Sequence, residues 1–396
     1  MELYFLILLC VIIILSYFYN YISSKIKVPS VILLILTGVF IKYIINATRF
    51  NFEIPMDILS VVGTLGLILI VFEGAIELEL KHKKRKVINR AFFSASIQII
   101  LAALLIGLII YLLTGTNFKN AIIYALPLSV ISSAIAIPSA HILTNEKKEF
   151  ITYESTMSDI IGIILFNFIV SNNVINLLNI SGFAFSIVIT LILSAVISIL
   201  LLLMLNKIQL KAKLMFLLSL LVLLYASGKL LHLSSLILVL ILGLVINNHH
   251  LITDKFKKFF NRELIEEDHK ILKTITQEMS FLVRTLFFVI FGFSIDFGLI
   301  ADFKTIYTGS LILLCIYFLR FFYLKLIIKS HLFPEIFIAP RGLITILLYY
   351  SIPIQYKIIN FEDSIIVFVI LVSSVLMAVG LITSNMSIIE ENINKN

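Results

Sequence analysis

Asp159 and Glu154 are acidic residues inside a long apolar run, and Ser155 and Ser158 accompany them. Residues four apart stack on one face of a helix, so Ser155 faces the same way as Asp159. Glu154 and Ser158 share an adjacent face by the same spacing. A carboxylate beside a hydroxyl offers the oxygen ligands that hard cations prefer. The spacing therefore predicts a proton or cation site at Asp159 and Ser155, with Glu154 turned toward another partner.

Three more ionisable residues, Glu73, Arg284 and Arg341, lie near the middle of other apolar runs. A charge at the centre of a membrane costs at least about 2.5–3.5 kcal/mol, so such residues usually form ion pairs or take part in transport. For the two arginines we expect an ion-pair role that supports the core. If they pair with Glu73 and Glu154, in either order, one carboxylate remains, and a proton or a monovalent cation could neutralise it.

The composition limits the class of protein. Of the 396 residues, 60% are hydrophobic and 14% are charged, and the mean hydropathy is +1.10. Soluble proteins carry about 25% charged residues, so a soluble enzyme, a nucleic-acid binder and a secreted disulfide scaffold are excluded. Cys10 and Cys315 lie in apolar runs and support neither a disulfide framework nor a metal site. The composition predicts an all-α polytopic membrane protein, and no cofactor is expected.

Apolar runs of about 20 residues, enough to cross a bilayer, recur along the chain. We expect thirteen spans, at 2–20, 29–46, 58–79, 88–113, 120–144, 150–171, 181–205, 212–229, 232–247, 276–298, 305–329, 333–353 and 363–384. The first run lacks a basic n-region and a small-residue cleavage site, so we expect an uncleaved span and not a signal peptide.

Basic residues indicate the orientation of these spans. Most of the 31 Lys and Arg residues fall in alternate connections, and Arg320 is assigned to them as part of the cytoplasmic end of the span 305–329. Cytoplasmic loops carry the excess of positive charge, so the N-terminus is predicted outside and the C-terminus inside. We expect a cytoplasmic loop at 249–275, a short cytoplasmic tail at 385–396, and a place in a bacterial inner membrane.

Five of the seven prolines fall in two spans. In the span 120–144, two prolines, the second of them Pro138, flank Ser132-Ser133, and the span 333–353 has Pro340 near its middle. Freed backbone groups are tolerated in a membrane only beside protein or a water-filled cavity. These are the fifth and twelfth spans, which cross in opposite directions. We therefore expect broken helices 5 and 12 within two inverted repeats, spans 1–6 and 8–13, a pattern that points to a transporter's binding site.

Four motifs resemble those of monovalent cation/proton antiporters of the sodium/proton exchanger type. The residues YESTMSD at 153–159 resemble the family's E-S-x-x-N-D motif, and GLILIVFEGAIEL at 66–78 resembles its third-helix motif. RTLFFVIFGFSIDF at 284–297 and APRGLIT at 339–345 resemble its tenth and twelfth helices. The motifs occur in the family's order over nearly the whole chain.

The resemblance implies roles for particular residues. The implied proton and cation site consists of Asp159, Ser155 and Glu73, with backbone carbonyls near Ser132 and Ser133. Arg341 would match the arginine of the family's Arg-Gly motif and hold the core together. From spacing and charge pairing, Glu154, Ser158 and Arg284 are also expected to support the core. The family commonly has Asn where this chain has Ser158, and Thr-Asp where it has Ser132-Ser133, which leaves the choice of cation open.

The resemblance also implies a homodimer in which a core domain moves against a dimerisation domain by an elevator-like step. We expect the core at 58–171 and 276–384, and the dimerisation helices at 1–46 and 181–247.

The predicted function is electroneutral exchange of one monovalent cation for one proton, with sodium expected first and lithium or potassium open. Asp159 has no second acid beside it, which resembles the electroneutral branch of the family. An intramembrane aspartyl protease would need two central aspartates, and only Asp159 qualifies. A cation- or pH-responsive sensor or channel on the same fold stays open as the alternative. No binding of nucleotide or nucleic acid is expected.

Overall fold

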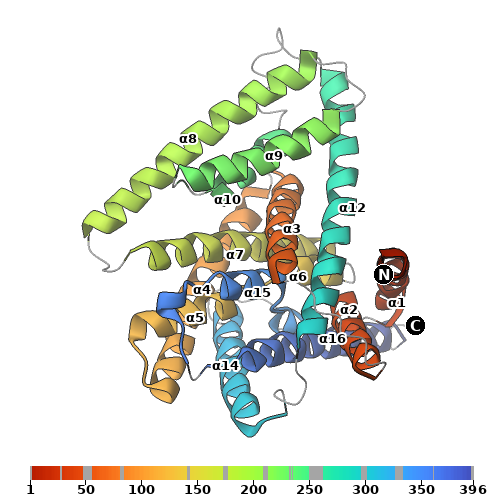
Figure 1. Cartoon of the computed structure of the whole chain (residues 1–396), viewed down its shortest axis with the longest axis vertical. Helices are drawn as coiled ribbons and strands as arrows, with labels where there is room; N and C mark the ends of the chain where they lie inside the picture. Colours follow the sequence, from red (N-terminus) through yellow and green to blue (C-terminus); the bar gives the residue numbers. More distant parts are fainter. Residues whose placement is uncertain are drawn as a thin grey trace. The chain divides into compact units, whose positions relative to one another are not determined.

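The computed structural model describes residues 2–26, 29–47, 56–80, 84–140, 143–172, 177–207, 213–231, 233, 235–248, 262–295, 301–325, 333–359 and 361–393. Within these ranges the regular elements are helices and no strand occurs, so the all-helical prediction is confirmed there (Figure 1). The α-helices are α1 (Glu2–Ile26), α2 (Ser30–Ala47), α3 (Met56–Glu77), α4 (Arg85–Thr114), α5 (Phe118–Ser129), α6 (Ser133–Ser139), α7 (Asn145–Ser171), α8 (Leu177–Lys207), α9 (Lys213–Leu230), α10 (Ser235–Asn247), α12 (Arg262–Ser294), α14 (Phe303–Tyr323), α15 (Leu343–Tyr350) and α16 (Asp363–Ile393).

Among the described residues, 7 helical stretches are long and apolar enough to cross a membrane. They are Arg85–Thr114, Phe118–Ser139, Asn145–Ser171, Ser181–Leu200, Lys270–Ser294, Phe303–Tyr323 and Asp363–Thr383. Shorter apolar helices occupy Ile7–Ser23, Ser30–Ile45, Met215–Leu230 and Ser235–Asn247. Each stretch overlaps one of the spans predicted from hydropathy.

The helix α12 begins earlier than the predicted span at 276–298. It starts at Arg262, so the second half of the predicted cytoplasmic loop 249–275 is helical, while residues 249–261 lie outside the described ranges. Between 262 and 275 the chain is rich in Glu, Lys, Leu and Ile and contains no Gly or Pro. These residues favour a helix and nothing among them ends one, so the helix continues beyond the apolar run. The cytoplasmic tail predicted at 385–396 is helical as far as Ile393.

The chain divides into two compact units. Unit 1 comprises Met1–Gly63, Val87–Gly162 and Arg284–Asn396, and unit 2 comprises Thr64–Lys86 and Ile163–Val283. In unit 2, α10 packs against both α8 and α9. The side chain of Asn248, just after α10, accepts a hydrogen bond from the backbone N–H of Leu80 (2.7 Å) and donates one to the carbonyl of Leu78 (3.0 Å), which ties α10 to the end of α3.

In unit 1, two non-helical stretches, called the extended stretches below, lie near the predicted proline positions. The first separates α5, which ends at Ser129, from α6, which begins at Ser133. The second runs from Ile338 to Gly342, between a 3₁₀ turn at Glu335–Phe337 and α15. Pro138 lies inside α6, whereas Pro340 lies in the extended stretch itself. Hence the first interruption begins at Val130, well before Pro138.

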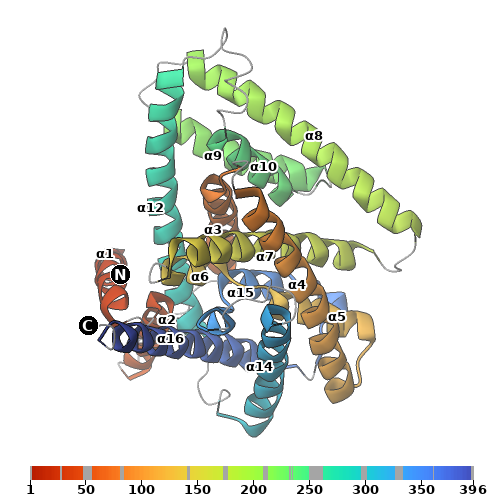
Figure 2. The same cartoon turned by 180° about the vertical axis from the view of Figure 1, so that it is seen from behind.

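The two extended stretches are joined directly. The backbone N–H of Ser132 donates to the carbonyl oxygen of Pro340 at 2.9 Å. The helices beside them also pack together, α5 against α15 and α14 against α16 (Figures 1 and 2). Buried backbone groups need hydrogen-bond partners. Here the N–H of the first stretch and the carbonyl of the second stretch are partners of each other.

Candidate functional site

Asp159 is buried in α7 and faces the first residue of α6. The residue is 4% exposed. Its Oδ2 accepts hydrogen bonds from the backbone N–H of Ser133 (3.2 Å) and from the Ser133 hydroxyl. Its other oxygen, Oδ1, is buried and has no hydrogen-bond partner among the described residues. One carboxylate oxygen is therefore anchored at the helix interruption, and the other is available to a proton or a cation.

Ser158, the residue before Asp159, contacts the same interruption at Ile131, two residues before Ser133. Its hydroxyl oxygen accepts the backbone N–H of Ile131 at 2.9 Å, and the residue is fully buried. Adjacent residues of α7 thus bind Ile131 and Ser133, and Ser132 between them binds Pro340. The extended stretch is held from both sides.

The remaining predicted site residues have different surroundings. Ser155 donates its hydroxyl hydrogen to the carbonyl of Ile151 in its own helix (2.8 Å), and both residues are buried. The hydroxyl oxygen of Ser132 is buried and has no partner within the described part of the chain. Glu73 is half-buried on α3 in unit 2, and Arg284 is half-buried on α12, where unit 1 resumes.

Glu154 pairs with Arg320, a residue that was predicted to lie in a cytoplasmic connection. The Nη2 of Arg320 lies 3.0 Å from Oε2 of Glu154, and both side chains are 1% exposed. Ser94 and Gln98 of α4 also donate to this carboxylate. Arg320 completes its contacts with the carbonyl of Glu335 (2.8 Å). The helices involved, α4, α7 and α14, are seen together in Figure 2.

The assignment of Arg320 to a cytoplasmic connection was wrong, because its side chain is buried in the core, where it pairs with Glu154. The hypothesis that Glu154 pairs with Arg284 or Arg341 is likewise replaced by the Arg320 pair. One signal was available in the sequence. Arg320 stands alone between Leu319 and Phe321 in a run of apolar residues, which is unusual for a solvated loop.

Arg341 is buried and binds backbone oxygens. Its guanidinium donates to the carbonyls of Leu128 (2.8 Å), Ser129 (3.3 Å) and Ala339 (2.6 Å). Leu128 and Ser129 form the last turn of α5, where unpaired carbonyls carry partial negative charge that favours a cation. The backbone N–H of Arg341 donates to Ser373 of α16 (3.0 Å). Arg341 therefore caps α5 from the second extended stretch.

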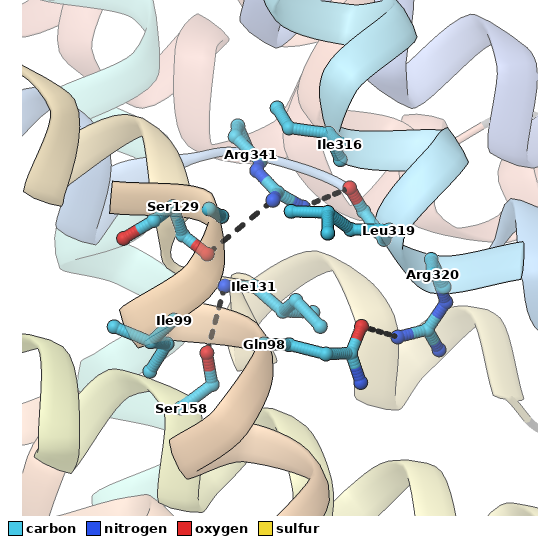
Figure 3. Close-up of a pocket in the computed structure, with 11 residues that line it drawn as sticks. Gln98, Ile99, Ser129, Ile131, Ser158, Ile316, Leu319, Arg320 and Arg341 are labelled. Carbon is cyan, nitrogen blue, oxygen red and sulfur yellow. Dashed lines mark hydrogen bonds between the residues drawn. The ribbon is translucent and has the colours of Figure 1, made fainter. Parts of the chain in front are cut away.

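A small pocket lies beside these groups. Its polar lining residues are Gln98, Ser129, Ser158, Arg320 and Arg341, and the other lining residues are apolar. Figure 3 shows Arg341 and Ser158 on opposite sides of Ile131, with Gln98 and Arg320 next to them. The pocket is thus bordered by the residue that precedes Asp159 and by both buried guanidinium groups of this region.

Comparison with known proteins adds two findings on the fold. The chain is similar to the sodium proton antiporter MjNhaP1 from Methanocaldococcus jannaschii at pH 8, with 20% identity, a TM-score of 0.71, and coverage of 96% of this chain and 97% of that chain. It is also similar to the structure of the same antiporter from an electron-microscopy map, with 22% identity, a TM-score of 0.66, and coverage of 96% and 95%. No curated protein gives a significant match.

The family model described as "sodium/hydrogen exchanger, transmembrane" matches residues 9–387, nearly the whole chain. Together with the long apolar helices, this match makes the protein an integral multi-pass membrane protein and a secondary transporter, not an enzyme. The chain belongs to the sodium/hydrogen exchanger family.

Proposed function

We propose that this protein exchanges sodium for protons one for one, and that Asp159 is the carboxylate that both ions share. The proposal rests on the burial and the hydrogen bonding of the Asp159 side chain. This side chain is buried, one oxygen is held by Ser133, and the other has no partner among the described residues. A buried carboxylate that lacks a compensating cation is costly, so a proton or a cation is strongly favoured there.

The chemistry follows from the oxygens around Asp159. A proton would bind on Oδ1, or a sodium ion would take Oδ1 as a ligand together with neighbouring oxygens. The Ser132 hydroxyl is buried and has no partner among the described residues. The Ser155 hydroxyl uses its hydrogen for Ile151 but keeps lone pairs for a cation. We propose that Glu73 of α3 helps to enclose the ion, and that carbonyl groups near Ser133 complete the ligand set.

Coupling needs only that the loaded site moves across the membrane more readily than the empty one. With a proton or one sodium ion bound, the Asp159 site is neutral, whereas the empty site carries a charge that is expensive in a low-dielectric barrier. Each passage therefore carries either a proton or a sodium ion. This accounts for exchange and for a stoichiometry of one for one.

We further propose how the helices take part. The pairs α5–α6 and η4–α15 (η4, Glu335–Phe337) would be the two discontinuous membrane helices of an inverted repeat, with their extended stretches at the ion site. The core at 58–171 and 276–384 would move by an elevator-like step against the dimerisation helices at 1–46 and 181–247 of a homodimer. The N-terminus would lie outside and the C-terminus in the cytoplasm of a bacterial inner membrane.

Proteoliposomes with an internal pH dye test this function. Sodium added outside should move protons in wild type, and Asp159→Asn should abolish the signal while the protein stays folded. Asp302→Asn is a matched control, because Asp302 is an exposed helix cap and asparagine caps a helix equally well. Cation-dependent proton movement in Asp159→Asn would refute the assignment, and its absence in wild type would refute antiport.

The same vesicles decide the cation and the stoichiometry. Sodium, lithium and potassium are added in turn, and we expect sodium to give the largest response at equal concentration. A clamp of the membrane potential should leave the exchange rate unchanged, because one charge moves in each direction. A rate that changes with the potential would contradict one-for-one exchange.

A further inference from the structure

The pocket beside Ser158 is bordered by hydrogen-bond donors that no acceptor among the described residues uses. A guanidinium has five N–H donors. Arg341 uses three of them, for the carbonyls of Leu128, Ser129 and Ala339. Arg320 makes four bonds, to Glu154 twice, to Gln98 and to the carbonyl of Glu335, which leaves one N–H.

Ser158 adds a further donor. Its oxygen accepts the N–H of Ile131, and its hydroxyl hydrogen has no acceptor among the described residues. Two protein acceptors at the pocket are already engaged, since Ser129 O binds Arg341 and Gln98 Oε1 binds Arg320. Within the described part of the chain, the pocket therefore has N–H and O–H donors that are not used by a protein acceptor.

The charges around the pocket point the same way. In the described part of the chain Arg341 has no carboxylate within ion-pair distance, whereas Arg320 is neutralised by Glu154. The end of α5 offsets only about half of a unit charge. A buried charge without a full partner is strongly destabilising, so a negative partner for Arg341 is favoured. Glu154 is the acid nearest to Arg320 and does not line the pocket.

We propose that this pocket binds a small monovalent anion, chloride in the cell, between Arg341, Arg320 and the Ser158 hydroxyl. The remaining lining is apolar and close, including Ile99, Ala102 and Ile316, which favours a monatomic anion and excludes an organic carboxylate. The anion is a resident counter-ion of the core and is not transported.

The expected consequence rests on the proposed function. With sodium on Asp159, the formal charges of Arg341, Asp159 and sodium sum to one positive charge, and a bound chloride brings this formal sum to zero. Sodium and the anion therefore favour each other's binding. Couplings between two sites typically change affinity by about 5–150-fold, and the effect is reciprocal.

Direct binding is tested by ³⁵Cl NMR on detergent-solubilised protein in a gluconate buffer. Wild type should broaden the chloride signal above the level of empty micelles, and bromide should reverse the broadening. Ala102→Val fills the pocket and should remove most of the effect, whereas Ala103→Val, an equally buried neighbour that does not line the pocket, should keep it. If Ala102→Val fails to fold, Ser158→Ala, which deletes one donor, should weaken the broadening instead. No excess broadening in wild type would overturn the proposal.

The functional consequence is tested in proteoliposomes with chloride or gluconate on both sides. Chloride should lower the sodium concentration at half-maximal exchange about fivefold or more. Equal values in the two anions would overturn the coupling. Asp159→Asn separates this proposal from the proposed function, because it should lose exchange and keep chloride broadening.

Discussion

The backbone N–H of Ser132 donates to the carbonyl oxygen of Pro340, so two interruptions more than 200 residues apart in the sequence share a hydrogen bond. Gly342 continues this contact. A Cβ at position 342 would lie 2.7 Å from the Ser132 hydroxyl oxygen and 2.7 Å from Cδ1 of Ile135. The close approach of the two stretches therefore depends on the absence of a side chain at this position.

Gly342→Ala should push the two stretches apart. Overpacking of a buried contact typically costs about 1–3 kcal/mol, so we expect a lower unfolding temperature in detergent and slower exchange. Gly182→Ala is the control, because a Cβ at Gly182 would meet nothing within 4 Å and alanine favours a helix. An unchanged unfolding temperature for Gly342→Ala would show that the contact tolerates a methyl group.

Arg320→Met should destabilise the protein strongly, because it leaves Glu154 charged and buried without its partner. Loss of one member of a buried pair costs about 3–5 kcal/mol. The double variant Arg320→Met with Glu154→Gln should be less destabilised than the single variant, since no buried charge is left over.

Thermal unfolding of these variants is compared with that of Lys304→Met, which breaks an exposed pair with Glu362 at 3.5 Å. Exposed pairs contribute about 0–1 kcal/mol, so this control should unfold close to wild type. Equal unfolding temperatures for the Arg320→Met and Lys304→Met variants would contradict the role assigned to the buried pair.

Ser158→Ala should leave the N–H of Ile131 buried without an acceptor, at a cost of about 1–3 kcal/mol. The displaced stretch carries Ser133, the hydrogen-bond donor to Asp159, so the half-saturating sodium concentration should also change. Ser158→Thr keeps the hydroxyl and should restore both properties. Ser198→Ala is the matched control, because that buried hydroxyl bonds, as far as the described residues show, to a carbonyl of its own helix. Equal behaviour of the two alanine variants would refute the role of Ser158.

The helices were predictable because each long apolar run must become a helix in a membrane, where backbone groups have no other partners. Hydropathy detects the apolar run but not the polar turns by which a helix extends beyond it. For this reason the start of α12 at Arg262 was not predicted. It also assigns charged residues near a span end to the loop. Arg320 is such a residue, and its burial depends on the direction in which the last turn of α14 faces.

The contacts at the candidate site were less predictable than its residues. Spacing places Ser155 and Asp159 on one face of α7, but only the packing of α6 against α7 makes Ser133 the hydrogen-bond partner of Asp159. A count of charges suggests a carboxylate for every arginine. Arg341 instead binds carbonyl oxygens of α5. A count of acidic and basic side chains does not include such backbone partners.

Competition at Asp159 predicts a defined dependence on pH. A proton and a sodium ion cannot both neutralise one carboxylate, so a lower pH should raise the half-saturating sodium concentration and leave the rate at saturating sodium nearly unchanged. Where most of the sites are protonated, the fraction able to bind sodium falls about tenfold per pH unit, and the apparent affinity falls with it. Sodium–sodium exchange, measured with ²²Na at equal pH on both sides, isolates this step from the proton gradient. Asp302→Asn should follow wild type. A maximal rate that falls with pH at constant half-saturation would place the proton elsewhere.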